Sequence, residues 1–141
     1  MDRGITDPDA PGFEGEALYP FARHLGMRML DWSEGAARFT LPAAPELMNR
    51  HGNLHGGVHA SLLDTVMGYA GCWTGDPERP QMCLTLTLNV QYLSRPKGET
   101  LIAEGVKTGG GRSTFFAEGT ILDETGEVIA KGTGTFRYRR G

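Results

Sequence analysis

NRHGNLHGGVHASLLD, residues 49–64, is the stretch that decides how this chain folds. A polar loop leads into the glycine pair Gly56-Gly57, and an apolar segment with helical spacing follows it. A helix that begins at such a pair exposes backbone N–H groups, which can stabilise a developing oxyanion. Asp64 is a single carboxylate on this apolar helix; burying it is costly, so its presence indicates a function. The combination predicts a site for acyl chemistry.

Length and composition narrow the class of protein. The chain has 141 residues, enough for one domain with a full core, and a net charge of −3. This charge gives no basic footprint for nucleic acid, and no apolar stretch of the sequence is long enough to span a bilayer. Residues 1–12 lack a signal-peptide pattern and are predicted to be a disordered lead-in to a single domain over residues 13–141. Cys72 and Cys83 lack metal-type spacing, which favours free thiols and a cytoplasmic location.

Hydrophobic periodicity predicts a short helix over residues 13–26, a hairpin of two strands over 27–32 and 36–41, and a long helix over 55–73. It then predicts four strands, over residues 83–93, 99–108, 113–122 and 127–138. The first long strand alternates so regularly that Leu84, Leu86, Leu88 and Val90 are predicted to share one face. Tight turns join the last three strands into an antiparallel meander. A long apolar helix beside one antiparallel sheet must be wrapped by it, so the predicted fold is α+β, a curled sheet around one central helix.

Small residues form a narrow stripe along the predicted central helix. At about 100° per residue, the stripe comprises Gly57, Ser61, Asp64, Gly68 and Gly71. The helical rise separates Gly57 from Asp64 by about 10 Å along the axis. A base and an oxyanion donor must both reach the same reacting group, so one helix spans this gap poorly. Two antiparallel helices across a two-fold axis close the gap, which predicts a homodimer with composite sites.

The chain resembles the hotdog-fold acyl-CoA thioesterases, especially the phenylacetate-pathway type. The resemblance covers nearly the whole chain and rests on Asn49, His55-Gly56-Gly57, Asp64 nine residues after the histidine, the strand from Leu84 to Tyr92, the turn at Arg112 and the segment 128–136. It implies a hotdog fold that hydrolyses an acyl-CoA thioester with neither cofactor nor metal. It also implies homodimers that pair into tetramers.

The same resemblance implies roles for five residues. The amide N–H of Gly57 would polarise the thioester carbonyl, and Asp64 would be the general base on water or the nucleophile of an anhydride route. Asn49 matches a position that orients water or substrate, and His55 one that holds the loop near the thiolate leaving group. Thr85 matches, by strand register, a hydroxyl that places the nucleophilic water.

Substrate contacts are expected at both ends of the thioester. CoA carries phosphates, so the mouth of the site should hold cations, and the candidates are Arg95, Lys97 and Arg112. Arg112 follows three glycines, a turn that can approach a pyrophosphate. Gly56 and Ser61 are also expected to contact substrate.

The acyl pocket is expected to be lined by Val58, Leu62 and Met67, together with residues of the partner subunit. Such a lining accommodates aryl, medium-chain or polyketide-like acyl groups, carried on CoA or on a carrier protein. The arginines near the end of the chain are interpreted as an exposed strand end: Arg137, Arg139 and Arg140.

Three alternative functions fit parts of the pattern. His51, His55 and His59 are spaced like metal ligands on one helix face, but His51 precedes the helix and no second acid completes a ligand set. A hotdog dehydratase would pair His55 with Asp64. An acyl-CoA-binding module would keep the groove without needing the carboxylate.

Overall fold

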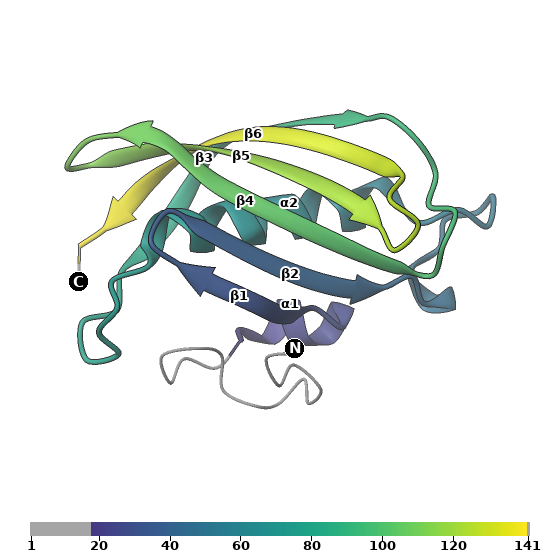
Figure 1. Ribbon diagram of the computed structural model, residues 1–141, viewed down its shortest axis with the longest axis horizontal. Helices are drawn as coiled ribbons and strands as arrows, with labels where there is room; N and C mark the ends of the chain where they lie inside the picture. The colour runs from purple at the N-terminus through teal and green to yellow at the C-terminus, as the bar shows by residue number, and fades with distance from the viewer. Residues whose placement is uncertain (1–17, 141) are drawn as a thin grey trace.

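A long helix lies in the hollow of a curled six-stranded sheet in the computed structural model, which describes residues 18–140 (Figure 1). The elements follow in the order α1 (Pro20–Leu25), β1 (Arg28–Ser33), β2 (Ala36–Pro42), the short 3₁₀ helix η2 (Pro45–Leu47), α2 (Gly56–Cys72), β3 (Met82–Tyr92), β4 (Thr100–Gly110), β5 (Thr114–Asp123) and β6 (Val128–Arg139). The predicted α+β architecture is confirmed. The predicted lead-in over residues 1–12 and the first residues of the predicted N-terminal helix lie outside the described part of the chain.

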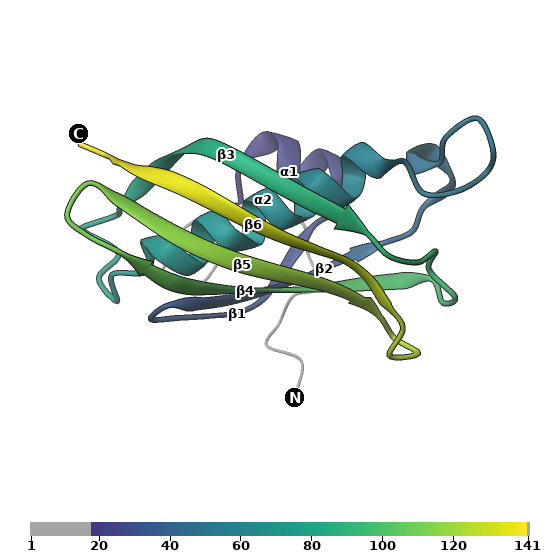
Figure 2. The ribbon, with the colours of Figure 1, turned by 90° about the horizontal axis from the view of Figure 1, so that it is seen from above.

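The sheet is antiparallel throughout, with the strand order β1-β2-β4-β5-β6-β3. The predicted meander of the last three strands is confirmed as β4-β5-β6. Strand β3 follows α2 in the chain but pairs with β6, so β3 and β1 form the two edges of the sheet. Seen from above, these edges lie on opposite sides of α2 (Figure 2).

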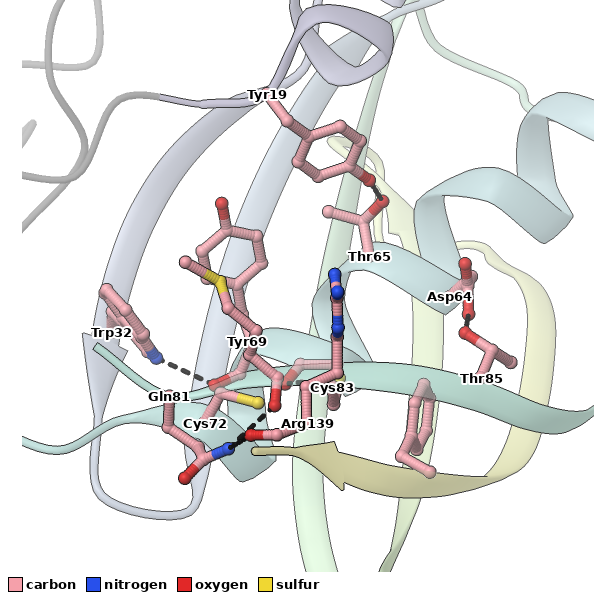
Figure 3. A pocket seen from close by; sticks show the side chains of 13 residues that line it. Tyr19, Trp32, Asp64, Thr65, Tyr69, Cys72, Gln81, Cys83, Thr85 and Arg139 are labelled. Carbon is pink, nitrogen blue, oxygen red and sulfur yellow. Dashed lines mark hydrogen bonds between the residues drawn. The ribbon is translucent and has the colours of Figure 1, made fainter. Parts of the chain in front are cut away.

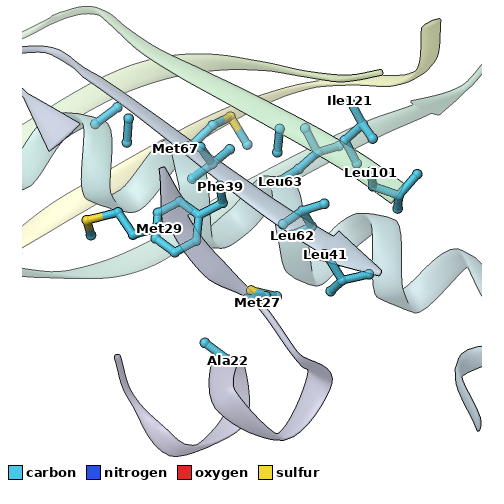
Figure 4. Close-up of a cluster of buried hydrophobic side chains, with 14 of the residues drawn as sticks. Ala22, Met27, Met29, Phe39, Leu41, Leu62, Leu63, Met67, Leu101 and Ile121 are labelled. Atoms are coloured by element: carbon cyan, nitrogen blue, oxygen red, sulfur yellow. The ribbon is translucent and has the colours of Figure 1, made fainter. Parts of the chain in front are cut away.

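The central helix α2 is held by burial on most of its surface. Nine of its 17 residues are buried, and Leu62, Leu63 and Met67 are fully buried in the core between helix and sheet (Figure 4). Burying each such side chain is worth about 1.5–3 kcal/mol. Val58, Leu62 and Met67 therefore pack in the core, and the prediction that they line an acyl pocket is wrong because they face the sheet.

Three glycines in register let the sheet approach α2 closely. Gly105, Gly119 and Gly132 lie opposite one another on β4, β5 and β6. A Cβ atom at Gly105 would lie 2.5 Å from the backbone oxygen of Val66, and one at Gly119 would lie 2.8 Å from a methyl carbon of Leu63. This glycine row forms a shallow channel, and the helix rests in it with its backbone almost against β4.

A β-bulge near Leu86 changes which way the side chains of β3 point. The pairing of β3 with β6 shifts register between Thr85 and Thr87. Leu84 lies opposite the exposed Arg137, whereas Leu88 lies opposite the buried Gly134, and directly opposed residues share a face. The prediction that Leu84, Leu86, Leu88 and Val90 share one face is therefore wrong, because the bulge adds one residue and reverses the alternation.

Between residues 18 and 140, no helix is both long enough and apolar enough to cross a membrane.

We expect Gly105→Ala to destabilise the protein by about 1–3 kcal/mol, because the added methyl group meets the backbone of α2 and the helix has to move. Gly111→Ala is the matched control, since nothing lies within 4 Å of a Cβ atom there, and it should leave stability within about 0.5 kcal/mol. Denaturant unfolding of both variants measures the difference. Equal unfolding free energies would show that α2 does not depend on the glycine row.

Candidate active site

A pocket of about 360 Å³ opens beside α2, where the two edges of the sheet fail to meet (Figure 3). Its walls come from the segment before α1, from β1, from the exposed side of α2, and from β3 and β6. The wall residues include Tyr19, Trp32, Asp64, Tyr69, Cys72, Cys83, Thr85, Phe136 and Arg139. The pocket thus combines four aromatic side chains with sulfur-containing and polar ones, among them one carboxylate and one guanidinium.

Asp64 and Thr85 form the polar pair of this pocket. The Thr85 hydroxyl donates a hydrogen bond of 2.6 Å to Oδ1 of Asp64, joining α2 to β3. Sequence reasoning singled out both residues, and the structure brings them together. The bond fixes the orientation of the carboxylate within the pocket.

The surroundings of Asp64 favour its protonated form more than water does. Burial raises the pKa of the carboxyl, and the hydrogen bond from Thr85 opposes part of that shift by stabilising the charged form. A carboxylate with a raised pKa is a stronger base than an exposed one. Asp64 therefore combines partial burial, fixed geometry and increased basicity in one place.

The N-terminus of α2 is capped by its own flanking residue. Nδ1 of His55 accepts a hydrogen bond of 2.8 Å from the Gly57 N–H, so this amide is occupied by the imidazole. Ser61 donates to the Gly57 carbonyl at 2.8 Å, within the same turn. Gly57 is exposed, and a group that takes its N–H has to displace the His55 ring first.

A second hollow, of about 510 Å³, lies at this end of α2. Gly56 and Arg95 both line it, as does Tyr92, whose hydroxyl donates to the Gly56 carbonyl at 2.7 Å. The Arg95 guanidinium contacts the side chain of Asn53 at 3.3 Å. Two predicted substrate-binding residues are thus brought together, at a distance from the pocket that holds Asp64.

Asn49 forms hydrogen bonds within the loop in which it lies. Its side-chain oxygen accepts hydrogen bonds from the backbone N–H groups of His51, at 2.9 Å, and Asn53, at 3.1 Å. The Asn49 backbone N–H also donates to the Asn53 carbonyl. Within one protomer, Asn49 shapes the loop before α2 and has no bond to Asp64 or Thr85.

The three cations predicted to hold CoA phosphates do not gather in one protomer. Lys97 forms an ion pair with Glu127 at 3.1 Å, and its backbone N–H is held by the buried carboxylate of Asp123 at 2.6 Å. Arg112 lies in the turn between β4 and β5, at the opposite end of the molecule from the start of α2 (Figure 1). Only Arg95 lies beside the N-terminus of the helix.

The stripe of small residues on α2 divides into two halves. Gly68 and Gly71 pack against side chains of the sheet: a Cβ atom at Gly68 would lie 3.5 Å from the Cys83 sulfur, and one at Gly71 would lie 2.1 Å from the Phe115 ring. Gly57 and Asp64 belong to the other half, which remains accessible. The small residues thus serve packing at one end and access at the other.

The histidines serve local structure. His51 is exposed in the loop, His55 caps α2, and His59 is buried with Nδ1 3.3 Å from the His55 carbonyl oxygen. Burial lowers the pKa of His59 and favours its neutral form. Within the part of the chain that the structure describes, no three His, Cys, Asp or Glu residues are arranged to hold a metal ion.

Several pocket residues escaped the sequence analysis because they come from distant segments. The Tyr19 hydroxyl is hydrogen-bonded to Thr65, the residue after Asp64, and burial raises the pKa of this phenol. Trp32 packs edge-on against Tyr69 at 5.1 Å between ring centroids. Arg139 is exposed at the end of β6, as predicted, and it also lines the pocket. No local motif distinguishes these positions; only the strand pairing brings them together.

Comparison with known proteins agrees with the fold. A curated relative from Halobacterium salinarum, named "Putative esterase", is 31% identical, and the match covers 82% of each chain. A thioesterase family protein from Silicibacter pomeroyi has a similar structure, with a TM-score of 0.76 and 27% identity over 87% of this chain and 91% of that one. The PaaI protein of the E. coli phenylacetic acid degradation operon shares the fold, with a TM-score of 0.75 and 23% identity over 86% of this chain and 85% of that one.

The family assignment follows from the sequence as well. The sequence model of the thioesterase superfamily matches residues 51–130, more than half of the chain, and spans the loop, α2 and most of the sheet. The hotdog fold predicted from the resemblance is thereby confirmed. The chain belongs to the thioesterase superfamily, a family of thioester hydrolases.

Proposed function

We propose that this protein hydrolyses an acyl-CoA thioester of the phenylacetate-pathway type, giving a free acid and CoA. The observation that carries the proposal is the bond between Asp64 and Thr85 in a pocket that also holds four aromatic side chains. A carboxylate that only supported the fold would gain nothing from facing such a pocket. The likeness in fold to PaaI supports the choice of an aryl-type acyl group.

The chemistry needs one proton acceptor and one stabiliser of negative charge. As a general base, Asp64 removes a proton from water while the water oxygen attacks the thioester carbonyl; the carbon–sulfur bond then breaks and the CoA thiolate leaves with the electron pair. As a nucleophile, the carboxylate attacks the thioester carbonyl and displaces the CoA thiolate, and water then hydrolyses the resulting anhydride to the free acid and the Asp64 carboxylate. Thr85 orients the carboxylate on either route, and the Gly57 N–H stabilises the oxyanion once the His55 ring has released it.

The site is composite in this proposal. Asp64 lies in one pocket and Gly57 in the exposed start of α2, about 10 Å apart along the helix. An antiparallel pair of α2 helices sets the Asp64 pocket of one protomer against the N-terminal hollow of its partner. The acyl group then occupies the aromatic pocket, while CoA passes the partner's Arg95.

The edge strand β3 is the surface expected to form the dimer. Its free side has unpaired backbone groups, and Leu84, Leu86 and Leu88 are 47%, 46% and 36% exposed. An exposed, apolar edge strand pairs readily with another strand. Pairing of β3 with its symmetry mate joins two sheets and brings the two α2 helices together. Dimers of this kind would pair into tetramers, in the cytoplasm.

We expect Asp64→Asn to lower kcat by about 10²- to 10⁴-fold, because the amide cannot accept the proton. The measurement is thiol release from a panel of aryl and aliphatic CoA thioesters that includes phenylacetyl-CoA. Calorimetric titration with the same thioester should give an unchanged dissociation constant.

If the protein hydrolysed no thioester of the panel faster than buffer alone does, the proposed hydrolase activity would be refuted. Unchanged turnover in Asp64→Asn, with binding intact, would remove the carboxylate from the mechanism. A wild-type protein that binds acyl-CoA without turnover would be a binding module.

We expect Thr85→Val to shift the acidic limb of the pH–rate profile to higher pH. Asp64 works in its ionised form, so activity falls as pH drops through its pKa. The hydrogen bond from Thr85 lowers that pKa, and its removal raises the pKa further. The measurement is kcat/KM against pH for the wild type and for Thr85→Val. Thr87→Val, two residues along the same strand, is the control; a coincident acidic limb in all three proteins would contradict the coupling.

We expect Leu86→Lys to dissociate the dimer and abolish turnover together, since lysine on an edge strand blocks pairing between strands. Val106→Lys is the control, because Val106 is equally exposed, at 52%, but lies on the inner strand β4. Analytical ultracentrifugation and thiol release measure the two effects. A fully active Leu86→Lys monomer would refute the composite site.

A further inference from the structure

Arg139 is the one cation in the aromatic pocket, and neither the family match nor the proposed hydrolysis gives it a role. Figure 3 shows its side chain reaching from the end of β6 into the ring of pocket side chains. Between residues 18 and 140, no carboxylate forms an ion pair with its guanidinium; the ion pairs there belong to Arg38 and Lys97. A guanidinium in a ligand pocket without an anion is a ready partner for one.

The position of Arg139 is fixed by the fold. The Gln81 side chain donates hydrogen bonds to the backbone carbonyls of Met82, at 2.8 Å, and Arg139, at 3.0 Å. Arg139 also pairs with Met82 across the last step of the β3–β6 ladder. These bonds hold the end of β6 against the start of β3 and fix the backbone of Arg139, whose side chain is exposed beside the pocket.

The strand register sets the spacing between Arg139 and the reacting centre. Thr85, which holds Asp64, lies opposite Phe136, and Arg139 is three residues further along β6. Three strand residues span about 10 Å. The space between is bounded by the rings of Trp32, Tyr69 and Phe136, which favours a flat acyl group.

The pocket is also of a size for the acyl group and not for the nucleotide of CoA. Its volume of about 360 Å³ is at the lower end for small-ligand sites. The carboxylate of Asp64 in the same pocket repels phosphates. Arg139 is therefore placed to meet the far end of an acyl group whose thioester lies at Asp64.

We propose that Arg139 selects acyl groups that carry a second, anionic group, so that the preferred substrate is a flat dicarboxylic acid bound to CoA through one of its carboxyls. This inference rests on the proposed thioester hydrolysis and adds the class of acyl group. The guanidinium pairs with the free carboxylate, and the aromatic walls hold the body of the acyl group between that pair and the thioester.

The test uses two thioesters that differ by a single group, benzoyl-CoA and 4-carboxybenzoyl-CoA. Wild-type kcat/KM should be at least about tenfold higher for the carboxylated thioester, a modest value for a charged bidentate pair. Arg139→Gln should remove this preference by lowering kcat/KM for the carboxylated thioester much more than for benzoyl-CoA. Arg139→Lys, which keeps the charge but loses the planar fork, should retain part of the preference. Arg137→Gln is the control, since Arg137 is exposed on the same strand and does not line the pocket.

Melting curves of the variants establish that each is folded; where Arg139→Gln is not, the partial preference of Arg139→Lys decides. Hydrolysis of benzoyl-CoA without a preference for the carboxylated thioester overturns the inference and leaves the proposed function intact. An equal loss on both thioesters in Arg139→Gln also overturns it, because Arg139 then holds CoA or the fold. Hydrolysis of neither thioester overturns the inference, and the proposed function falls only if the wider panel fails as well.

Discussion

The close contact between α2 and the glycine row of Gly105, Gly119 and Gly132 is the constraint on which the rest of the structure depends. Because the helix rests so near the sheet, its position is set by backbone contacts as well as by side chains. The core residues on its inner face then fill the remaining space. The opposite face of the same helix is left for Asp64, whose place relative to β3 is therefore fixed by packing on the other side.

Fixed placement matters because the candidate chemistry joins two elements that are distant in sequence. Asp64 is on α2 and Thr85 is on β3, and their 2.6 Å hydrogen bond requires the helix and the edge strand to keep their spacing. The β-bulge beside Thr85 belongs to this geometry, since it lets Thr85 and Leu88, three residues apart, both lie on the face of β3 that is turned to the helix. Bulges commonly re-aim a side chain next to a functional site.

Most of the architecture could be predicted from the sequence, because its signals are local. The apolar helix after Gly56-Gly57, the hairpin and the three-stranded meander all follow from spacing and turn residues, and each is confirmed within a few residues. The pairing of β3 with β6 was not anticipated, since nothing in a strand's own sequence names its neighbour. The bulge near Leu86 was missed for a related reason: the alternation of leucines in the sequence is perfect, and only the pairing shows the extra residue.

The site was predictable to a similar extent. Asp64 stood out because a lone carboxylate on an apolar helix is unusual, and strand register was enough to suggest Thr85. Tyr19 and Arg139 could not be found this way, because they reach the pocket from opposite ends of the chain. Arg112 stays a prediction: its turn looks suited to a pyrophosphate, and within one protomer it lies far from the N-terminus of α2.

The cap formed by His55 on the Gly57 N–H has a consequence for how such a site would discriminate. A neutral carbonyl that competes with the imidazole exchanges one ordinary hydrogen bond for another, so the resting thioester gains little from that amide. An oxyanion is a much stronger acceptor and outcompetes the ring. His55 would thus cancel most of the stabilisation that the Gly57 amide gives to the bound thioester, but not the stabilisation that it gives to the oxyanion of the transition state. Only interactions that are stronger in the transition state than in the ground state accelerate a reaction.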